Sequence, residues 1–480
     1  MISTATMITF FAYLILLLVI GTLAWKATST SSDYILGGRK MGPAVTALSV
    51  GASDMSGWLL LGLPGAIYLS GLSEAWIGVG LVLGAWLNWK LVSKRLRIYT
   101  EFTNDSLTLP DFLEHRFADP GLLRGIAATT TLLFFIFYTS SGMVSGAILF
   151  EQVFGLDYTT ALLIGAAIIV SYTFVGGFFA VSWTDFFQGI LMLIALLVVP
   201  MVVLGGGDAE GVPELDPSML TMLPEGTTLL GIISLMAWGL GYFGQPHILS
   251  RFMAIGSVKD LPTSRRISIG WMVLSLIGAL ATGLAGAVHF AGSPLANPET
   301  VFIELTKVLF NPWVAGMLIA AILSAIMSTI DSQLLVCSSV MTEDFYRKWM
   351  RPNASEKELV AVGRITVLAV AVVATVIALN PESTVLELVA YAWSGFGAAF
   401  GPVILLALYW QGYSRQGAVA TILTGAVVVV IWDQLSGGIF DVYQLLPGFI
   451  FATLAGVIVS KLMPPQAEVV SQHQEFEQKL

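Results

Sequence analysis

Residues 51–62 read GASDMSGWLLLG and lie in a stretch apolar enough to cross a lipid bilayer. Gly51 and Gly57 disfavour a regular helix there, and Asp54 places an ionisable group between them. Backbone that leaves a helix at membrane depth is tolerated only where it is buried in protein or lines a cavity. The stretch therefore predicts a broken membrane helix with a functional site at the break.

The composition of the whole chain predicts an all-α polytopic membrane protein. Its 480 residues are 56% hydrophobic and 11% charged, with a mean hydropathy of +0.83, far outside the range of soluble domains. The first apolar stretch is too long, and lacks the basic residues, for a cleaved signal peptide. With about 20 apolar residues per crossing, we predict thirteen membrane helices, at 7–27, 41–70, 74–93, 123–151, 158–179, 183–205, 228–247, 267–290, 312–336, 360–379, 384–410, 416–435 and 443–463.

Several kinds of partner and cofactor find no support in the sequence. The single cysteine, Cys337, excludes an intramolecular disulfide, and no Cys/His cluster has the spacing of metal ligands. The net charge of -9 gives no indication of nucleic-acid binding. Nothing in the sequence indicates an obligate protein partner, so the expected surroundings are the lipid bilayer.

Basic residues predict the orientation independently, because Lys and Arg concentrate in cytoplasmic loops. With the N-terminus outside, only Lys307 of the 22 Lys and Arg residues falls on the outer side. The acidic, basic-free loop 205–226 lies outside in the same arrangement. Thirteen crossings then place the C-terminal tail in the cytoplasm.

The seventh predicted span repeats the irregularity of the second. It contains WGLGYFGQP at 238–246, whose glycines and proline cannot sustain a regular helix. Interrupted helices five spans apart are what an inverted five-plus-five repeat predicts, with the substrate site at mid-membrane between the halves. The chain then divides into a first helix with its loop, two inverted repeats, two accessory helices and a short tail, at 1–40, 41–205, 206–410, 411–465 and 466–480.

The glycines of this second irregular stretch also match a dinucleotide-binding motif. Gly239, Gly241 and Gly244 have the GxGxxG spacing. That motif needs a strand before it and a helix after it in a soluble βαβ unit, whereas this copy interrupts an apolar span. We therefore assign the three glycines to the helix break.

The ninth predicted span carries hydroxyl groups in AAILSAIMSTIDSQ, at 320–333. Ala325, Ser328 and Thr329 stand at i, i+3 and i+4 and share one helix face. Together with carbonyls freed at the break in the second span, they would offer a hard cation a small cage of neutral oxygens. Serine and threonine in membrane helices also bond their own i−4 carbonyl or a neighbouring helix, so this alternative stays open.

Seven stretches, in one order along nearly the whole membrane region, resemble the sodium/solute symporter family. Within the family they are most similar to bacterial members that carry L-proline with sodium. The resemblance implies the leucine-transporter fold and sodium-coupled uptake by alternating access across the bacterial plasma membrane. The stretches are DYILGGR (33–39), TALSVGASDMSGWLLLGLPGA (46–66), LTLPDF (107–112), YTFVGGFFAVSWTD (172–185), ISLMAWGLGYFGQPHILSRFMA (233–254), SAIMSTIDSQLLVCSS (324–339) and YAWSGFGAAFGP (391–402).

The resemblance implies a sodium site built from three backbone carbonyls and two hydroxyls. It also implies that Asp54 is needed for sodium-dependent transport. We favour an indirect role for this carboxylate, because the other ligands already surround the ion. Alternatively, the carboxylate could attract the cation, or it could cap the freed amides of the half-helix that follows. The implied ligands are Ala52, Met55, Ala325, Ser328 and Thr329.

The resemblance also places L-proline beside the ion, with a gate nearby. Flat aromatic walls suit a small, rigid, apolar ring, and a carboxylate is stabilised at a helix N-terminus at the break. The residues assigned to the pocket, its polar backbone and its lid are Tyr138, Trp238, Tyr242, Ser56, Gly57 and Trp58. Those assigned to the gate are Gln245, Pro246 and His247.

Other classes of function find less support in the sequence. A membrane-embedded enzyme would need catalytic groups, and neither HExxH nor a clear Ser/His pair occurs within the predicted spans. A channel would show a filter motif such as TVGYG, or rings of charge. A sodium-coupled symporter for another small solute remains the main alternative.

Overall fold

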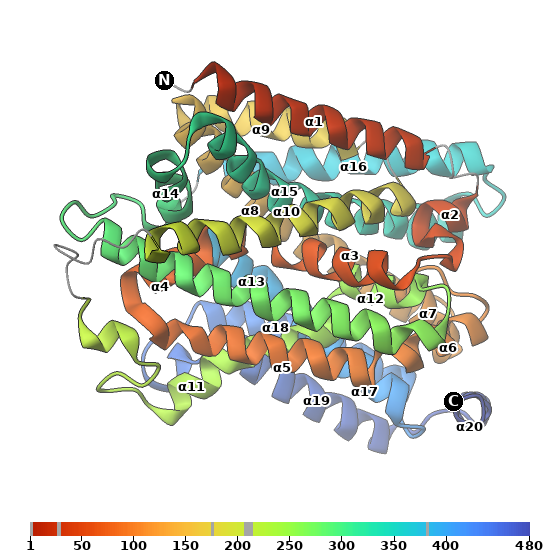
Figure 1. Cartoon of the computed structure of the whole chain (residues 1–480). Coiled ribbons are helices and arrows are strands. Elements are labelled where there is room, and N and C mark those ends of the chain that lie inside the picture. Colours follow the sequence, from red (N-terminus) through yellow and green to blue (C-terminus); the bar gives the residue numbers. More distant parts are fainter. Residues whose placement is uncertain (1–2, 26–29, 174–176, 206–214, 381–383) are drawn as a thin grey trace.

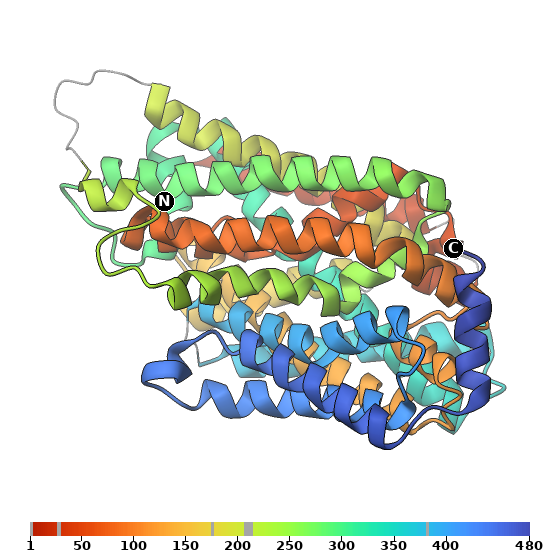
Figure 2. The same ribbon diagram turned by 90° about the horizontal axis from the view of Figure 1, so that it is seen from below.

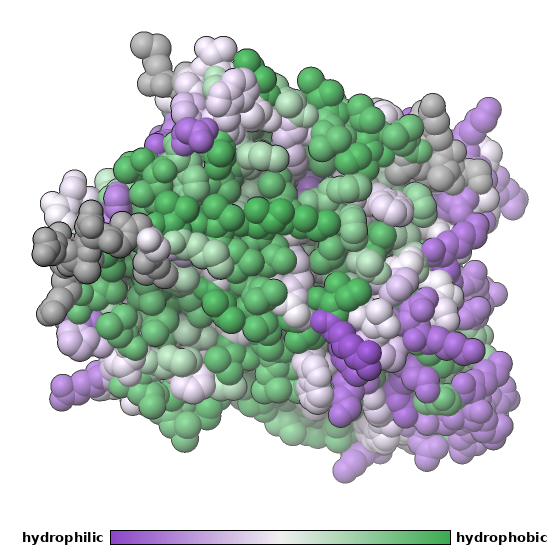
Figure 3. All heavy atoms as spheres, viewed as in Figure 1, coloured by the Kyte–Doolittle hydropathy of each residue, from purple (hydrophilic) through white to green (hydrophobic). Residues whose placement is uncertain are grey.

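The computed structural model describes residues 3–25, 30–173, 177–205, 215–380 and 384–480, and this part of the chain contains helices but no β-strand. Ten of its helices are long and apolar enough to cross a membrane, and the shorter apolar helices Tyr158–Ser171 and Leu229–Gly244 add to them. The long helices lie side by side as one bundle (Figure 1). Hydrophobic atoms cover most of its flank, and hydrophilic atoms gather at one end (Figure 3). The protein is therefore a multi-pass membrane protein.

Each of the thirteen predicted spans coincides with a helix or with a broken pair of helices in the described part of the chain. The second predicted span consists of α3 (Pro43–Met55), the short 3₁₀ turn η2 (Gly57–Leu59) and α4 (Gly62–Ser70). The seventh consists of α11 (Leu229–Met236), the 3₁₀ segment η5 (Ala237–Gly244) and α12 (Pro246–Ala254). The unbroken spans are α1 (Thr4–Trp25), α5 (Ala75–Leu91), α8 (Leu122–Phe154), α9 (Tyr158–Thr173), α10 (Phe178–Gly205), α13 (Leu261–His289), α15 (Pro312–Ser339), α16 (Glu356–Ala378), α17 (Val385–Tyr409), α18 (Arg415–Asp433) and α19 (Leu445–Leu462).

The two breaks have different physical causes. α3 ends at Met55 because Ser56 adopts φ 49° and ψ -170°, which no helix can contain. In η5 the glycines keep negative φ, and they are needed for close packing instead. A Cβ on Gly239 would overlap the carbonyl of Gly80 in α5, and one on Gly241 would overlap the indole of Trp393 in α17. The seventh span is interrupted where predicted, but its glycines serve contact between helices.

Some helices extend further than the hydropathy predicts. The seventh span was expected to end at residue 247, and α12 continues to Ala254. The ninth was expected to end at 336, and α15 reaches Ser339 and continues as a π-helical segment, η8 (Val340–Met350). Only the second extension is rich in charged residues, which hydropathy scores as the end of a span. The α12 extension is mostly apolar and buried, so the predicted end at residue 247 is too early. Lys26 and residues 206–214 of the predicted outer loop lie outside the described residues.

Short helices form one end of the bundle. They are α2 (Ser31–Leu36), α6 (Ser93–Phe102), α7 (Leu109–Arg116) and the C-terminal α20 (Ala467–Glu477). α20 lies across this end (Figure 2), and α1 begins at the opposite end of the molecule (Figure 1). Beginning and finishing at opposite ends is what an odd number of crossings requires.

Aromatic stacking and hydrogen bonds hold α20 in place. The rings of Tyr99 in α6 and Phe476 in α20 stack with centroids 3.8 Å apart. The Tyr99 hydroxyl also lies 3.2 Å from Nδ1 of His473. Arg95 pairs with Glu477 at 2.5 Å. The last helix is therefore docked on the bundle through specific side chains.

Candidate functional site

Hydroxyls of α15 meet the end of α3 at the centre of the bundle. The Ser328 hydroxyl donates a hydrogen bond to the Ala52 carbonyl at 2.7 Å, and the Thr329 hydroxyl donates to the same oxygen at 3.4 Å. Ser328 also approaches the Ala325 carbonyl at 3.2 Å. All four residues are buried. Met55, the fifth predicted ligand, is the last residue of α3 and lines the adjoining pocket.

This cluster offers oxygen ligands without net charge. The last carbonyls of any helix lack partners within it, so the end of α3 presents acceptors to α15. In the described part of the chain, no group of three or more His, Cys, Asp or Glu side chains could hold a metal ion. Neutral oxygens suit a singly charged hard cation better than a doubly charged one, whose desolvation costs more. The arrangement fits a monovalent cation.

Asp54 faces the pocket beside this cluster and connects two broken helices. The Tyr242 hydroxyl, from η5, donates a hydrogen bond to Oδ2 of Asp54. The Tyr138 hydroxyl, from α8, donates to the backbone carbonyl of Asp54 at 3.3 Å. The amide of Trp58 donates to the Ser56 hydroxyl at 3.2 Å, so Ser56, and not Asp54, caps the turn after the break.

Aromatic rings enclose the adjoining pocket, which we call the central pocket. The indoles of Trp58 and Trp238 stack with centroids 5.7 Å apart. Tyr242 meets Trp393 edge to face at 5.1 Å. The residues that line it are Asp54, Met55, Ser56, Trp58, Leu81, Tyr138, Trp238, Tyr242, Val389 and Trp393.

Five of the six predicted substrate residues line the central pocket, and Gly57 does not. A Cβ on Gly57 would lie 2.8 Å from the side chain of Ser145 in α8. That contact is too short for any larger residue. Gly57 therefore lets α8 approach the break, and its part in the site is to permit this packing.

The central pocket is closed in this conformation. Its free volume is about 10 Å³, on a measure by which a single water needs about 10–15 Å³. A solute as large as an amino acid enters only when one of the rings moves. Trp58 follows directly on the break, and its indole nitrogen has no hydrogen bond within the described residues.

The sequence reasoning missed one prominent wall of the pocket, Trp393 in α17. Its indole nitrogen donates to the carbonyl of Trp238 at 2.8 Å, and its own carbonyl accepts from the Gln245 side chain at 3.2 Å. Trp393 lies in the glycine-rich stretch YAWSGFGAAFGP, and a tryptophan in such a stretch is the sequence feature that could have indicated a pocket wall. Its partners lie far away in the chain, so the sequence alone does not reveal them.

The three predicted gate residues follow the pocket along α12. Gln245 contacts Trp393, as described above. The His247 ring packs edge-on against Phe135 and Tyr138, with centroids 5.7 Å and 6.1 Å away. Its two ring nitrogens are buried without a hydrogen-bond partner among the described residues. Pro246 begins α12 and lines a second cavity.

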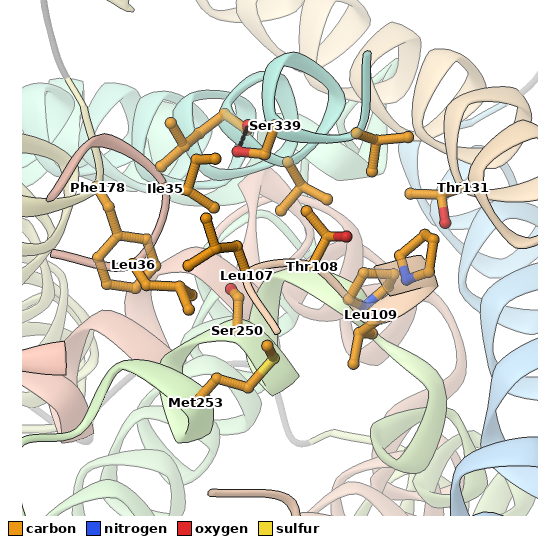
Figure 4. Close-up of a pocket in the computed structure, with 15 residues that line it drawn as sticks. Ile35, Leu36, Leu107, Thr108, Leu109, Thr131, Phe178, Ser250, Met253 and Ser339 are labelled. Atoms are coloured by element: carbon orange, nitrogen blue, oxygen red, sulfur yellow. Dashed lines mark hydrogen bonds between the residues drawn. The ribbon is translucent and has the colours of Figure 1, made fainter. Parts of the chain in front are cut away.

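This second cavity lies between α12 and the short helices at the end of the bundle. It has a free volume of about 30 Å³. Leu36, Leu107, Thr108 and Met253 surround the same space from α2, the segment before α7 and α12 (Figure 4). The walls are mostly apolar. Pro246, which directly follows Gln245 in the chain, is the first residue of α12 that lines the cavity.

Arginine contacts close the molecule beyond the second cavity. Arg39 donates to the carbonyl of Met253 at 2.7 Å and to that of Ser106 at 2.9 Å. Arg97 donates to the carbonyl of Ile255 at 2.8 Å. These bonds tie the end of α12 to α6 and the neighbouring loops. The end of α12, which lines the second cavity through Met253, is therefore held by hydrogen bonds.

Comparisons with known proteins agree on one family. A family model described as the sodium:solute symporter family matches residues 34–425. A protein named sodium/proline symporter from Salmonella typhimurium is 54% identical over 96% of this chain and 94% of its own length. The protein of the same name from Escherichia coli strain K12 is 53% identical over 96% and 94%. A solved structure of the substrate-bound outward-open state of a Na⁺-coupled sialic acid symporter matches in fold, with TM-score 0.79 at 18% identity over 96% of this chain and 99% of that one.

Proposed function

The chain belongs to the sodium:solute symporter family, and we propose that it couples the inward movement of sodium to the uptake of L-proline by alternating access. The relatives are transporters, so it is a transporter and not an enzyme. Its all-helical bundle is that of leucine-transporter-like symporters. The observation that carries the proposal is the break after Met55, which joins a cage of neutral oxygens to an aromatic pocket.

Sodium binds where α3 meets α15. Each of the hydroxyls of Ser328 and Thr329 now donates to the Ala52 carbonyl, and each can turn a lone pair to an ion placed between the helices. The carbonyls of Ala325 and Met55 complete the proposed set. Binding therefore replaces hydrogen bonds between two helices by shared coordination, which draws α3 and α15 together.

L-proline binds in the central pocket, next to this ion. Tyr138, Trp238 and Tyr242 provide flat apolar surfaces for its ring, and Trp58 acts as the lid. The substrate carboxylate is placed near the amides after Ser56, where the following turn begins. Because Asp54 bonds to Tyr242, its role is indirect: it fixes a pocket wall to the end of α3.

Release to the cytoplasm follows α12. Gln245, Pro246 and His247 separate the central pocket from the second cavity, and Arg39 closes the far side of that cavity. Opening requires α12 to move away from α6 and from the loops that hold it. The small central pocket and the hydrogen bonds at the end of α12 fit a conformation that is not open to the cytoplasm.

The proposed organisation follows from the two breaks and from the charge distribution. Spans within 41–205 and 206–410 form the two inverted repeats, which 411–465 and the tail 466–480 follow. The N-terminus lies outside, and the end with α2, α6, α7 and α20 is cytoplasmic. The basic side chains of Arg39, Arg95 and Arg97 at that end support this orientation.

One sodium ion supplies enough free energy for concentrative uptake. A tenfold gradient and about 100 mV release about 1.4 and about 2.3 kcal/mol respectively. Their sum supports roughly 500-fold accumulation of a zwitterion. Uptake of labelled proline into proteoliposomes, with and without a sodium gradient, tests the proposal. We expect accumulation only with sodium, and uptake that ignores sodium would refute it. If the chain accumulates another small solute with sodium and not proline, the family assignment stands and the substrate is wrong.

A further inference from the structure

Three aromatic rings stack in a row beside the central pocket. Trp238 stacks with Trp58 at 5.7 Å and 28°, and with Tyr443 at 5.1 Å and 16°. Trp58 and Trp238 line the pocket, whereas Tyr443 does not. Tyr443 belongs to the connection between α18 and α19, which lies outside the ten helices of the two repeats.

Tyr443 is held at both ends. Its backbone amide donates to the Ser234 hydroxyl in α11 at 2.8 Å. Its own hydroxyl donates to the carbonyl of Ala390 in α17 at 2.7 Å. Ser234 lies one turn before Trp238 in the same broken span, and Ala390 lies one residue after the pocket residue Val389. The tyrosine therefore spans the two helices that carry pocket walls.

A cavity of about 450 Å³ lies on the side of Tyr443 away from the second cavity and α20. Asp441 and Val442, which directly precede Tyr443, line it together with Ser234 and Trp76. By the orientation proposed above, this cavity is on the outer side. Tyr443 thus lies between an outer cavity and the indole of Trp238, which lines the central pocket.

We propose that Tyr443 is a positioning residue for the substrate, which sets the plane of the Trp238 indole against which the proline ring packs. The inference rests on the proposed function. Of the two rings stacked on Trp238, Trp58 is the lid and leaves when the pocket opens. Tyr443 stays, because two hydrogen bonds fix it to α11 and α17. The accessory pair α18 and α19 is therefore part of the substrate site through this one side chain.

The test compares Tyr443→Ala, Tyr443→Phe and Phe440→Ala in proteoliposomes that hold equal amounts of folded protein. Stacked aromatic pairs contribute about 0.5–1.5 kcal/mol, so Tyr443→Ala should raise the KM for proline about two- to tenfold. Its maximal rate, and sodium binding measured without proline, should not change. Tyr443→Phe keeps the ring and the amide bond to Ser234 but loses the hydroxyl bond to Ala390, so its KM should lie between those of the wild type and Tyr443→Ala.

Phe440→Ala is the matched control. Phe440 lies in the same connection, but its ring packs on Trp432 at 4.9 Å and does not contact Trp238 within the described structure. Its KM should stay at the wild-type value. An unchanged KM in Tyr443→Ala, an equal loss in Tyr443→Phe, or a fall in maximal rate alone would overturn the inference. Wild-type protein without sodium-driven proline uptake would instead overturn the proposed function, so the two failures are distinguishable.

Discussion

The hydroxyl of Tyr242 donates a hydrogen bond to the buried carboxylate of Asp54, and this bond joins η5 to the end of α3. Each partner stands at the interruption of its own span, one in each proposed repeat. Asp54 is also next to Met55, the last residue of α3. We therefore expect a change at the proposed sodium cage to reach an aromatic wall of the central pocket through this bond.

Tyr242→Phe should weaken both proline and sodium binding. It removes the donor from a buried carboxylate, and an unsatisfied buried group costs about 1–3 kcal/mol, or roughly five- to 150-fold in affinity. Asp54→Asn should act in the same direction. Because the two groups form one bond, the double variant should be no weaker than the worse single variant. Binding isotherms for all four proteins measure this cycle.

Tyr413→Phe is the control for that cycle. It also removes a buried tyrosine hydroxyl, one that lies 2.6 Å from the Thr421 hydroxyl and away from the central pocket. Its affinities for proline and sodium should match those of the wild type. Additive losses from Asp54→Asn and Tyr242→Phe would show that the two residues act independently.

Ser328→Ala and Thr329→Ala should each raise the sodium concentration for half-maximal uptake by about tenfold or more, since loss of one ligand worth about 1.4 kcal/mol has that effect. The maximal rate at saturating sodium should change far less. Ser324→Ala is the control, because this hydroxyl lies one turn earlier in α15 and bonds the Ala320 carbonyl and Tyr13. Unchanged half-saturation in both variants would remove these residues from the site.

The sequence predicts the positions of the two breaks, although the local effect of glycine is not their cause: Ser56 ends α3, and the glycines of η5 serve close packing. GASDMSG and WGLGYFGQP interrupt their spans at the predicted places, and the hydroxyls of Ser328 and Thr329 meet the Ala52 carbonyl as their spacing suggests. Contacts between distant segments are different. Position 241 needs a glycine because the indole of Trp393 packs directly against it. Trp393 lies 152 positions later in the chain, so no local sequence pattern reveals this contact.

The same limit explains the unpredicted parts of the pocket. Trp393 and Tyr443 reach Trp238 only because α17 and the α18–α19 connection pack against η5. The docking of α20 depends likewise on Tyr99, far away in sequence. Hydropathy locates apolar segments, but it does not say which of their faces meet.

Cysteine accessibility should show the predicted orientation. On a Cys337→Ala background, a cysteine in place of Glu225 should react with an impermeant reagent added to right-side-out membranes. One in place of Gln474 should react only after the membrane is permeabilised. Both native side chains are exposed, so burial does not limit the reaction. The opposite pattern would invert the proposed topology.

The docking of α20 should weaken as the pH falls from about 6.5 towards 4. Burial lowers the pKa of His473 to about 4, with Arg116 and Arg95 also lowering it and Glu477 opposing them. Tyr99 is the fourth polar neighbour. The docked histidine therefore binds fewer protons than the released one, whose ordinary pKa is 6.5. Docking is fully stable above 6.5 and loses stability as the pH approaches 4.

Distances between spin labels at Gln474 and Asn104, both exposed, would follow this release on the Cys337→Ala background. The distribution should broaden between pH 7 and pH 5. His473→Gln keeps a polar side chain without a titrating ring, and its distribution should not depend on pH. Identical distributions of the parent protein at both pH values would exclude His473 as the controlling group.

Sodium should prepare the central pocket for proline. An ion between α3 and α15 fixes the broken helix that carries Asp54 and Trp58, so proline no longer bears the cost of ordering that wall. Linkage requires that proline raise the affinity for sodium by the same factor. Trp238→Ala should abolish proline binding while sodium still binds, whereas Thr329→Ala should weaken both.

Calorimetric titration of the purified protein with proline, in sodium chloride and in choline chloride, tests this coupling most directly. The account predicts that the Kd for proline is at least about tenfold lower in sodium, which corresponds to about 1.4 kcal/mol of coupling. Equal proline affinity in the two salts would contradict it.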